Sequence, residues 1–269
     1  MPQDRERAAG YPRVRRTVDH DAPDRGPAAY IGEFVGTFAL VFFITAAVSL
    51  YVEPGAAGAP APFIDFSVIG LVHVFVLFML IQTLAIVSGA HFNPAVTAAM
   101  TSIRQIKPID AAIYVVVQLA GGVAGALLTK ALLNDEGDAD NYGAVGITDK
   151  LDGAAFGGFV VEFIGTFFLV WAIVGVAVHP EALKEWAGFV IGGTLGFLVM
   201  VFAPLTGAGF NPARAFGPAI VSGEFGGGGT FLLAFVLGPV LGAIAAAFAY
   251  FYLFIQPGKK GPEGMDPVG

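Results

Sequence analysis

The chain contains no cysteine, so disulfide bonds, thiol catalysis and cysteine-ligated metal sites are excluded. Charge is also scarce, because charged residues make up only 13% of the 269 residues, with a net charge of −7. The few basic residues are scattered, which argues against a nucleic-acid partner. No nucleophile–base pair and no group of metal ligands stands out in the sequence, so it predicts neither an enzyme nor a bound cofactor or metal.

Long apolar stretches are what the sequence has instead. Hydrophobic residues make up 56% of the chain, which is typical of repeated transmembrane helices. A helix needs about 20 apolar residues to cross a bilayer, and the alternating polarity of barrel strands is absent from the sequence. We therefore predict an all-α, multi-pass protein with six transmembrane helices in the lipid bilayer. The fifth span is short and is expected to end at Pro204. The predicted spans are 29–52, 63–87, 110–133, 154–178, 186–203 and 230–255.

Lysine and arginine are distributed unevenly along the chain. They gather in the N-terminal tail 1–28, in the connection between the second and third spans, and in the C-terminal tail 256–269, whereas the connection 134–153 is acidic. Basic connections remain in the cytoplasm as a rule. Both termini are therefore predicted to be cytoplasmic and 134–153 extracellular. We expect the protein in the cell membrane (plasma or inner membrane).

Two further segments begin with Asn-Pro and are too short to span. Asparagine is a strong helix N-cap, and proline suits the first helical position, so helices are expected to start at Asn93 and Asn211. The apolar residues that follow each asparagine cover about half a crossing. The sequence therefore predicts two re-entrant half-helices, 93–103 and 211–222.

The chain is an internal duplication. "EFVGTFALVFF" from Glu33 recurs as "EFIGTFFLVWA" from Glu162, and "SGAHFNPAV" recurs as "GAGFNPARA". Each copy holds three spans and one half-helix, which gives a first repeat, 29–133, and a second repeat, 154–255. Three is an odd number, so the two copies have opposite orientations, as in the inverted repeats of transporters. The two Asn-Pro starts are then expected to meet near the membrane midplane.

Paired Asn-Pro-Ala boxes in such a chain resemble those of the aquaporin, or major intrinsic protein, family. The boxes are Asn93-Pro94-Ala95 and Asn211-Pro212-Ala213, and the second is followed by Arg214. The resemblance extends over about 30–255 and implies a passive channel that conducts water and excludes protons and ions. It also implies a homotetramer.

The resemblance further implies which residues select the solute. By position, the narrow filter would consist of His73, Val199, Ala208 and Arg214. This set resembles that of plant tonoplast intrinsic proteins, which pass water and sometimes ammonia, urea or hydrogen peroxide. Ala215 and Ala219 depart from the pattern of dedicated glycerol facilitators. We therefore expect a water channel that also passes small neutral solutes.

A second set of residues is expected to support the re-entrant loops. Carboxylates inside a membrane can form proton relays, but their duplication at equivalent sites favours a bracing role. Bracing of the loop backbone is also what the resemblance implies. The structural set is Glu33, Glu162, Gln118, His91, Pro94, Ala95, Pro212 and Ala213, beside the pore residues Asn93 and Asn211.

Three other functions stay open at the level of sequence. A glycerol or other small-solute facilitator of the same family would differ from a water channel in its permeability to glycerol. An ion-coupled secondary transporter also uses discontinuous helices, although the sequence shows no evident cluster of ligands for a coupling ion. A membrane enzyme is disfavoured because the sequence shows no catalytic constellation.

Overall fold

The computed structural model describes residues 24–52 and 63–256, so the predictions on most of both tails lie outside the described residues. Within that part, six helical segments are long and apolar enough to cross a membrane, and no strand occurs. The spans are α1 (Pro27–Tyr51), α2 (Phe63–Ser88), α4 (Pro108–Leu132), α6 (Ala155–Ile173) with a π-helical turn (Val174–Val178), α7 (Ala187–Thr206), and a last span made of α9 (Gly228–Phe231), a π-helical stretch (Leu232–Leu237), α10 (Gly238–Tyr250) and a final π-helical turn (Phe251–Ile255).

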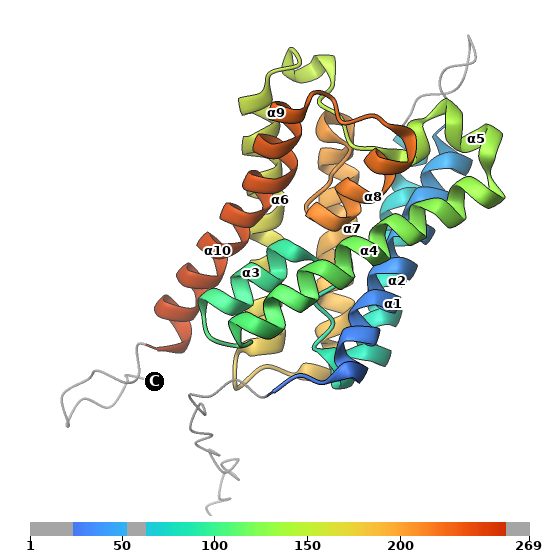
Figure 1. Cartoon of the computed structure of the whole chain (residues 1–269). Helices are drawn as coiled ribbons and strands as arrows, with labels where there is room; N and C mark the ends of the chain where they lie inside the picture. Colours follow the sequence, from blue (N-terminus) through green and yellow to red (C-terminus); the bar gives the residue numbers. More distant parts are fainter. Residues whose placement is uncertain (1–23, 53–62, 257–269) are drawn as a thin grey trace, which may run out of the picture.

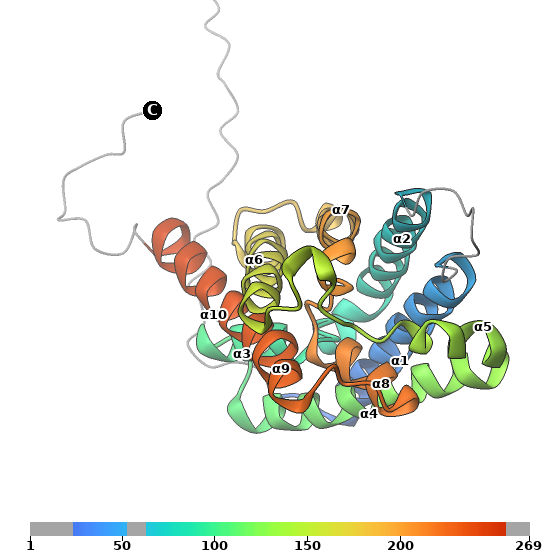
Figure 2. The same cartoon turned by 90° about the horizontal axis from the view of Figure 1, so that it is seen from above.

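The spans of the two repeats pack in equivalent pairs. α1 packs against α4 in the first repeat, α6 packs against α10 in the second, and α2 packs against α7 across the two repeats. Seen from above, α1 and α2 lie on one side of the molecule and α6 and α10 on the other (Figure 2). Glycine permits the close contacts, because a Cβ at Gly125 would collide with the carbonyl of Phe38, and one at Gly242 with that of Phe163. These glycines therefore pack helices within one subunit.

Two short helices lie between the spans. α3 (Pro94–Ser102) follows α2, and α8 (Pro212–Ser222) follows α7, within one residue of the predicted half-helices. α8 packs mainly on α4 of the first repeat, whereas α3 packs mainly on α10 of the second (Figure 1). Each half-helix is therefore held chiefly by the repeat to which it does not belong.

The fifth span is longer than predicted. α7 continues through Pro204 to Thr206, so the prediction that it ends at Pro204 is wrong. The carbonyls of its last turn find donors outside the helix: the Gly146 N–H donates to Thr206 at 3.2 Å, and the Thr148 hydroxyl donates to Pro204 at 3.0 Å. Gly207, with φ of 78°, then closes the helix in the left-handed conformation. Pro204 has no N–H to donate to the carbonyl four residues earlier, so the helix continues past it with one internal hydrogen bond fewer.

Short helices also occur between the longer elements. The connection 134–153 contains α5 (Asn134–Ala139) and two 3₁₀ turns, Asn141–Gly143 and Asp149–Leu151, and a third 3₁₀ turn, Lys184–Trp186, leads into α7. α5 and α9 lie at one end of the bundle, which we call the α5 end (Figure 1). The start of α1 and the end of α10 lie at the opposite end, which we call the α1 end.

Candidate functional site

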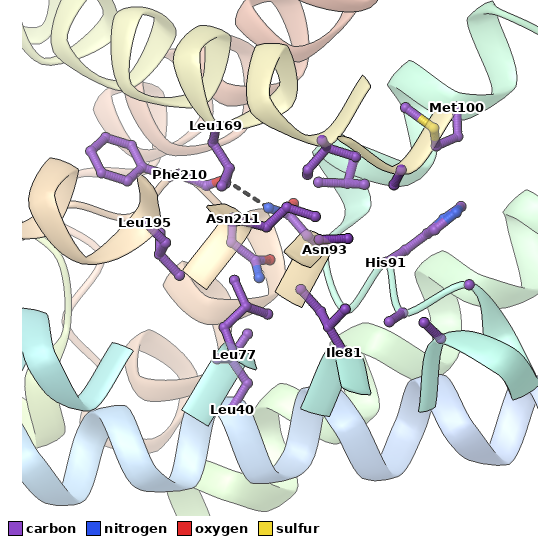
Figure 3. A pocket seen from close by; sticks show the side chains of 18 of the residues that line it. Leu40, Leu77, Ile81, His91, Asn93, Met100, Leu169, Leu195, Phe210 and Asn211 are labelled. Atoms are coloured by element: carbon purple, nitrogen blue, oxygen red, sulfur yellow. Dashed lines mark hydrogen bonds between the residues drawn. The ribbon is translucent and has the colours of Figure 1, made fainter. Parts of the chain in front are cut away.

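A cavity of about 440 Å³ lies inside the bundle. Its wall includes His73 and Arg214 in one part and Arg25 and Lys184 in another. The lining is mostly aliphatic, and no aspartate or glutamate belongs to it within the described part of the chain. In Figure 3, Asn93 and Asn211 lie side by side, surrounded by Leu40, Leu77, Ile81, Leu169 and Leu195.

Asn93 and Asn211 cap the two half-helices. The Oδ1 atom of Asn93 accepts a hydrogen bond from the Ala95 N–H at 2.8 Å, and that of Asn211 accepts one from the Ala213 N–H at 2.9 Å. In each case the following proline occupies the first helical position. This is the arrangement that the two Asn-Pro-Ala boxes predict.

The same two side chains also connect the repeats. Asn93 Nδ2 donates to the carbonyl of Phe210 at 2.8 Å, and Asn211 Nδ2 donates to the carbonyl of Phe92 at 2.8 Å. The N-terminal ends of α3 and α8 therefore meet. A primary amide has two N–H bonds, so each asparagine retains one N–H beyond this cross-link. Both residues line the cavity.

The loops before the half-helices share an unusual backbone. Left-handed φ values occur at Gly89, Ala90 and Phe92 in the first loop and at Gly207, Ala208 and Phe210 in the second. A residue other than glycine in this region costs roughly 1–2 kcal/mol. Such loops persist only where the surroundings hold them in place, which makes their hydrogen-bond partners important.

Glu33 is the main partner of the first loop. Its Oε1 accepts from the His91 N–H at 2.9 Å and the Ser88 hydroxyl at 2.7 Å. Its Oε2 accepts from the Phe92 N–H at 2.6 Å and from Gln118 Nε2 at 2.8 Å. Glu33 is fully buried, so this carboxylate meets N–H groups that would otherwise have no partner.

Glu162 holds the second loop in the same way, with one difference. Its Oε1 accepts from the Gly209 N–H at 2.9 Å and the Thr206 hydroxyl at 2.7 Å, and its Oε2 accepts from the Phe210 N–H at 2.6 Å. The position equivalent to Gln118 is Val236, which cannot donate a hydrogen bond. Glu162 therefore holds its loop with three of the four contacts that Glu33 makes.

Sequence reasoning did not single out the hydroxyl groups of this arrangement. Ser88 and Thr206 each donate to the glutamate of their own repeat. Both lie five residues before the asparagine of their box, and this shared spacing was the signal that could have found them.

His73, Ala208 and Arg214 all line the cavity. His73 Nδ1 lies 2.8 Å from the carbonyl oxygen of Ile69, so this nitrogen carries the proton and Nε2 is left as an acceptor. Arg214 Nη1 donates to the carbonyl of Gly143 at 2.8 Å, and Arg214 Nε is buried without a partner among the described residues. An acceptor from α2 and donors from α8 therefore border the same cavity.

Val199, the fourth predicted filter residue, does not belong to the cavity lining. It is 1% exposed and lies in a hydrophobic cluster with Leu195, Leu198 and Ala208. The structure thus brings three of the four predicted residues to the cavity wall and places Val199 among the apolar residues beside them.

Arg25 and Lys184 contribute positive charge to the cavity lining. Sequence reasoning placed Arg25 in a tail, but its guanidinium lies against the first re-entrant loop, where a Cβ added at Gly89 would be 3.3 Å from Nη2. The Arg25 N–H donates to Asp110 at 3.4 Å, and Tyr30 donates its hydroxyl proton to the same carboxylate at 2.6 Å. These contacts hold the start of α1 beside the loop.

Comparison with known proteins places this fold and these boxes in one family. The family model described as Major intrinsic protein matches residues 26–250. Nodulin-26 of Glycine max is 41% identical over 220 residues, covering 82% of this chain and 75% of that protein. The probable aquaporin AqpM of Archaeoglobus fulgidus is 36% identical over 237 residues, covering 83% and 96% respectively.

A solved structure confirms the predicted fold. The X-ray structure of the aquaglyceroporin from Plasmodium falciparum matches with a TM-score of 0.69, covering 86% of this chain and 97% of that one. At 23% identity, the likeness establishes the all-α, aquaporin-like fold.

The predicted similarity of the filter to tonoplast intrinsic proteins is not supported, because the relatives that match over most of this chain include nodulin-26 and archaeal AqpM proteins. A resemblance at four filter positions is weaker evidence for a subgroup than sequence identity over more than 200 residues. The transporter and enzyme alternatives also fall, because proteins of the matched family are passive channels. The chain belongs to the major intrinsic protein family of membrane channels.

Proposed function

We propose that this channel conducts water, excludes protons and ions, and also passes small neutral solutes such as ammonia, urea and hydrogen peroxide. The observation that carries the proposal is the pairing of Asn93 and Asn211, whose side chains both border the cavity while each caps one half-helix. Two helix N-termini, each equivalent to about half a positive elementary charge, thereby face one point of the cavity.

The remaining N–H of each asparagine explains how water passes without protons. A water molecule between the two amides accepts a hydrogen bond from both, so its own hydrogens point away from the asparagines. Neighbouring waters then cannot form an unbroken chain of donors through this point, and a proton cannot hop along it. The two helix dipoles add an electrostatic barrier to cations.

Selection among neutral solutes is assigned to His73, Val199, Ala208 and Arg214. His73 Nε2 supplies an acceptor, Arg214 supplies donors, and Ala208 leaves room for a solute. In this proposal Val199 lies directly behind the lining residues Leu195 and Ala208, so that a larger side chain at this position reaches the passage. Glu33, Glu162, Gln118 and His91 support the loops and take no part in proton transfer.

Stopped-flow permeability of proteoliposomes to water, glycerol, urea and ammonia tests the proposal. We expect rapid water flux, and we expect Val199→His to retain water flux while reducing that of glycerol, urea and ammonia, because the ring narrows the passage. Glycerol flux that equals or exceeds water flux would instead identify a glycerol facilitator. If Val199→His changes no flux, Val199 lies outside the passage.

Orientation and assembly are proposed on separate grounds. The uneven distribution of lysine and arginine supports cytoplasmic termini in the cell membrane. The outer faces of the spans carry exposed apolar side chains such as Ile31, Phe75 and Phe197, which suit lipid or neighbouring subunits. We propose a homotetramer, and the mass of the protein in nanodiscs measures its oligomeric state.

A further inference from the structure

We propose that Asp140 positions Arg214 in the channel, and that protonation of Asp140 lowers water permeability. The inference rests on the proposed role of Arg214 in the passage and adds a second residue, outside the Asn-Pro-Ala boxes, that controls it. Asp140 lies at the α5 end, between α5 and the 3₁₀ turn Asn141–Gly143.

The turn after Asp140 carries the carbonyl that binds Arg214. Asp140 Oδ1 accepts from the Gly143 N–H at 3.3 Å and from the Ser49 hydroxyl of α1 at 3.5 Å. The carbonyl of Gly143 in turn accepts from Arg214 Nη1 at 2.8 Å. The Asp140 side chain, together with the Asp140 carbonyl at 3.2 Å, therefore holds the N–H of the residue whose carbonyl holds the guanidinium.

The backbone of this turn needs such support. Asn141 and Tyr142 have φ values of 56° and 53°, a conformation that is costly for residues other than glycine. Tyr142 is 1% exposed, and its ring fills the space beside Gly137, where a Cβ would collide with it. The turn is thus anchored by the carboxylate on one side and by the buried ring on the other.

Two polar atoms beside this turn have no partner among the described residues. One is Oδ2 of Asp140 and the other is Nε of Arg214, and both are buried. The carboxylate and the guanidinium also attract each other electrostatically. Asp140 therefore holds Arg214 on the side of the turn by its charge as well as through Gly143.

The charged groups around Asp140 are few. α8 contributes Arg214, which Glu162 of α6 also attracts. α4 contributes Lys130, whose Nζ lies 5.1 Å from the centre of the Tyr142 ring, and α5 contributes the exposed Asp135 and Asp138. α1 contributes the uncharged hydroxyl of Ser49. Among the described residues, Asp140 is the one whose carboxylate accepts a hydrogen bond from the Gly143 N–H.

Burial raises the pKa of Asp140 into the range in which a mild change of pH alters its charge. Desolvation raises the pKa of Asp140 to about 6, while the hydrogen bonds from Gly143 and Ser49 and the charge of Arg214 oppose this rise. Above that pH the carboxylate attracts Arg214. Below it this attraction is lost and that of the buried Glu162 remains; in our proposal the guanidinium then leans away from the turn into the passage, which narrows the passage for water.

The test is the pH dependence of water flux in proteoliposomes with equal pH on both sides, between pH 7.5 and 5.0. We expect wild-type water flux to fall about two- to fivefold as the pH is lowered, with a midpoint near pH 6. A change of this size is expected when the attraction between a partly exposed carboxylate and a guanidinium is lost. Asp140→Asn should show low flux without a midpoint, whereas Asp140→Glu should keep the titration. The exposed Asp138→Asn is the matched control and should behave as wild type.

A readout through Arg214 separates positioning from a general effect on folding. In an Arg214→Val background, the pH dependence should disappear, because Asp140 acts through the guanidinium. High wild-type flux that is constant with pH would overturn this inference and leave the proposed function intact, as would a titration that survives in Asp140→Asn. Absence of water flux at every pH would instead overturn the proposed function.

Discussion

Asn93 and Asn211 use nearly every polar atom of their side chains. One oxygen caps a helix, one N–H reaches the opposite loop, and one N–H is left for the solute. No other common side chain of this size offers an acceptor and two donors. At this scale, small chemical changes should therefore separate the structural function of the residue from its function in conduction.

Asn211→Asp makes that separation. The carboxylate still caps α8, so the protein should fold, but it cannot donate to the carbonyl of Phe92 and it places a negative charge between the two helix dipoles. We expect water flux to fall and a cation or proton leak to appear in planar-bilayer recordings. Asn134→Asp, an exposed site on α5, adds the same charge and should cause no leak. A folded Asn211→Asp protein with normal flux and no leak would reduce Asn211 to a cap.

The absence of cysteine gives a second prediction for single residues. Mercurials act on thiols, so mercuric chloride should leave the water permeability of this channel unchanged. Leu195→Cys places a thiol on the cavity lining and should make permeability sensitive to mercury, with recovery after a thiol reagent is added. Inhibition of the wild-type channel would mean that mercury binds another group beside the passage.

At the scale of elements, the two re-entrant loops are a natural comparison. The first has Thr97 and Gln118 in mutual contact, with Gln118 Nε2 3.0 Å from Thr97 Oγ1, whereas the second has Ala215 and Val236 at the equivalent positions. Both loops nevertheless have the same left-handed residues and the same contacts to a buried glutamate. The glutamates are therefore the essential supports, and the Thr97–Gln118 pair is an addition.

The loss of thermal stability on substitution should be larger for the glutamate contacts than for the Thr97–Gln118 pair. The double variant Thr97→Ala, Gln118→Val copies the second repeat and should change thermal stability little. Glu33→Gln replaces an acceptor by an amide nitrogen facing buried N–H groups, so it should cost roughly 1–3 kcal/mol and lower the unfolding temperature clearly. Thermal unfolding in detergent measures both. Equal losses in the two variants would contradict the ranking.

At the scale of the whole molecule, sequence patterns predicted the six spans, the two half-helices and the duplication, because capping residues and apolar length are local properties. They failed where a distant segment decided the outcome. α7 continues past Pro204 to Thr206, where Gly146 and Thr148 supply donors to the carbonyls of the last turn. Arg25 reaches the cavity because Asp110 and Tyr30 hold the start of α1. The contact of Arg214 with Gly143 likewise depends on the turn Asn141–Gly143, whose conformation no sequence motif predicts.

The packing of α3 on α10 has a consequence for the order in which the protein is made. Synthesis runs from the N-terminus, so the first half-helix emerges well before the helix that covers it. Until the last span inserts, α3 lacks its main packing partner and should remain open to water and to proteases. A chain ending after Ser222 should accordingly exchange amide hydrogens rapidly over 94–102, whereas a chain ending at Gln256 should protect them. Slow exchange in the shorter chain would show that the first repeat closes alone. The channel is thus expected to complete its fold in one late step, when the last span inserts into the membrane.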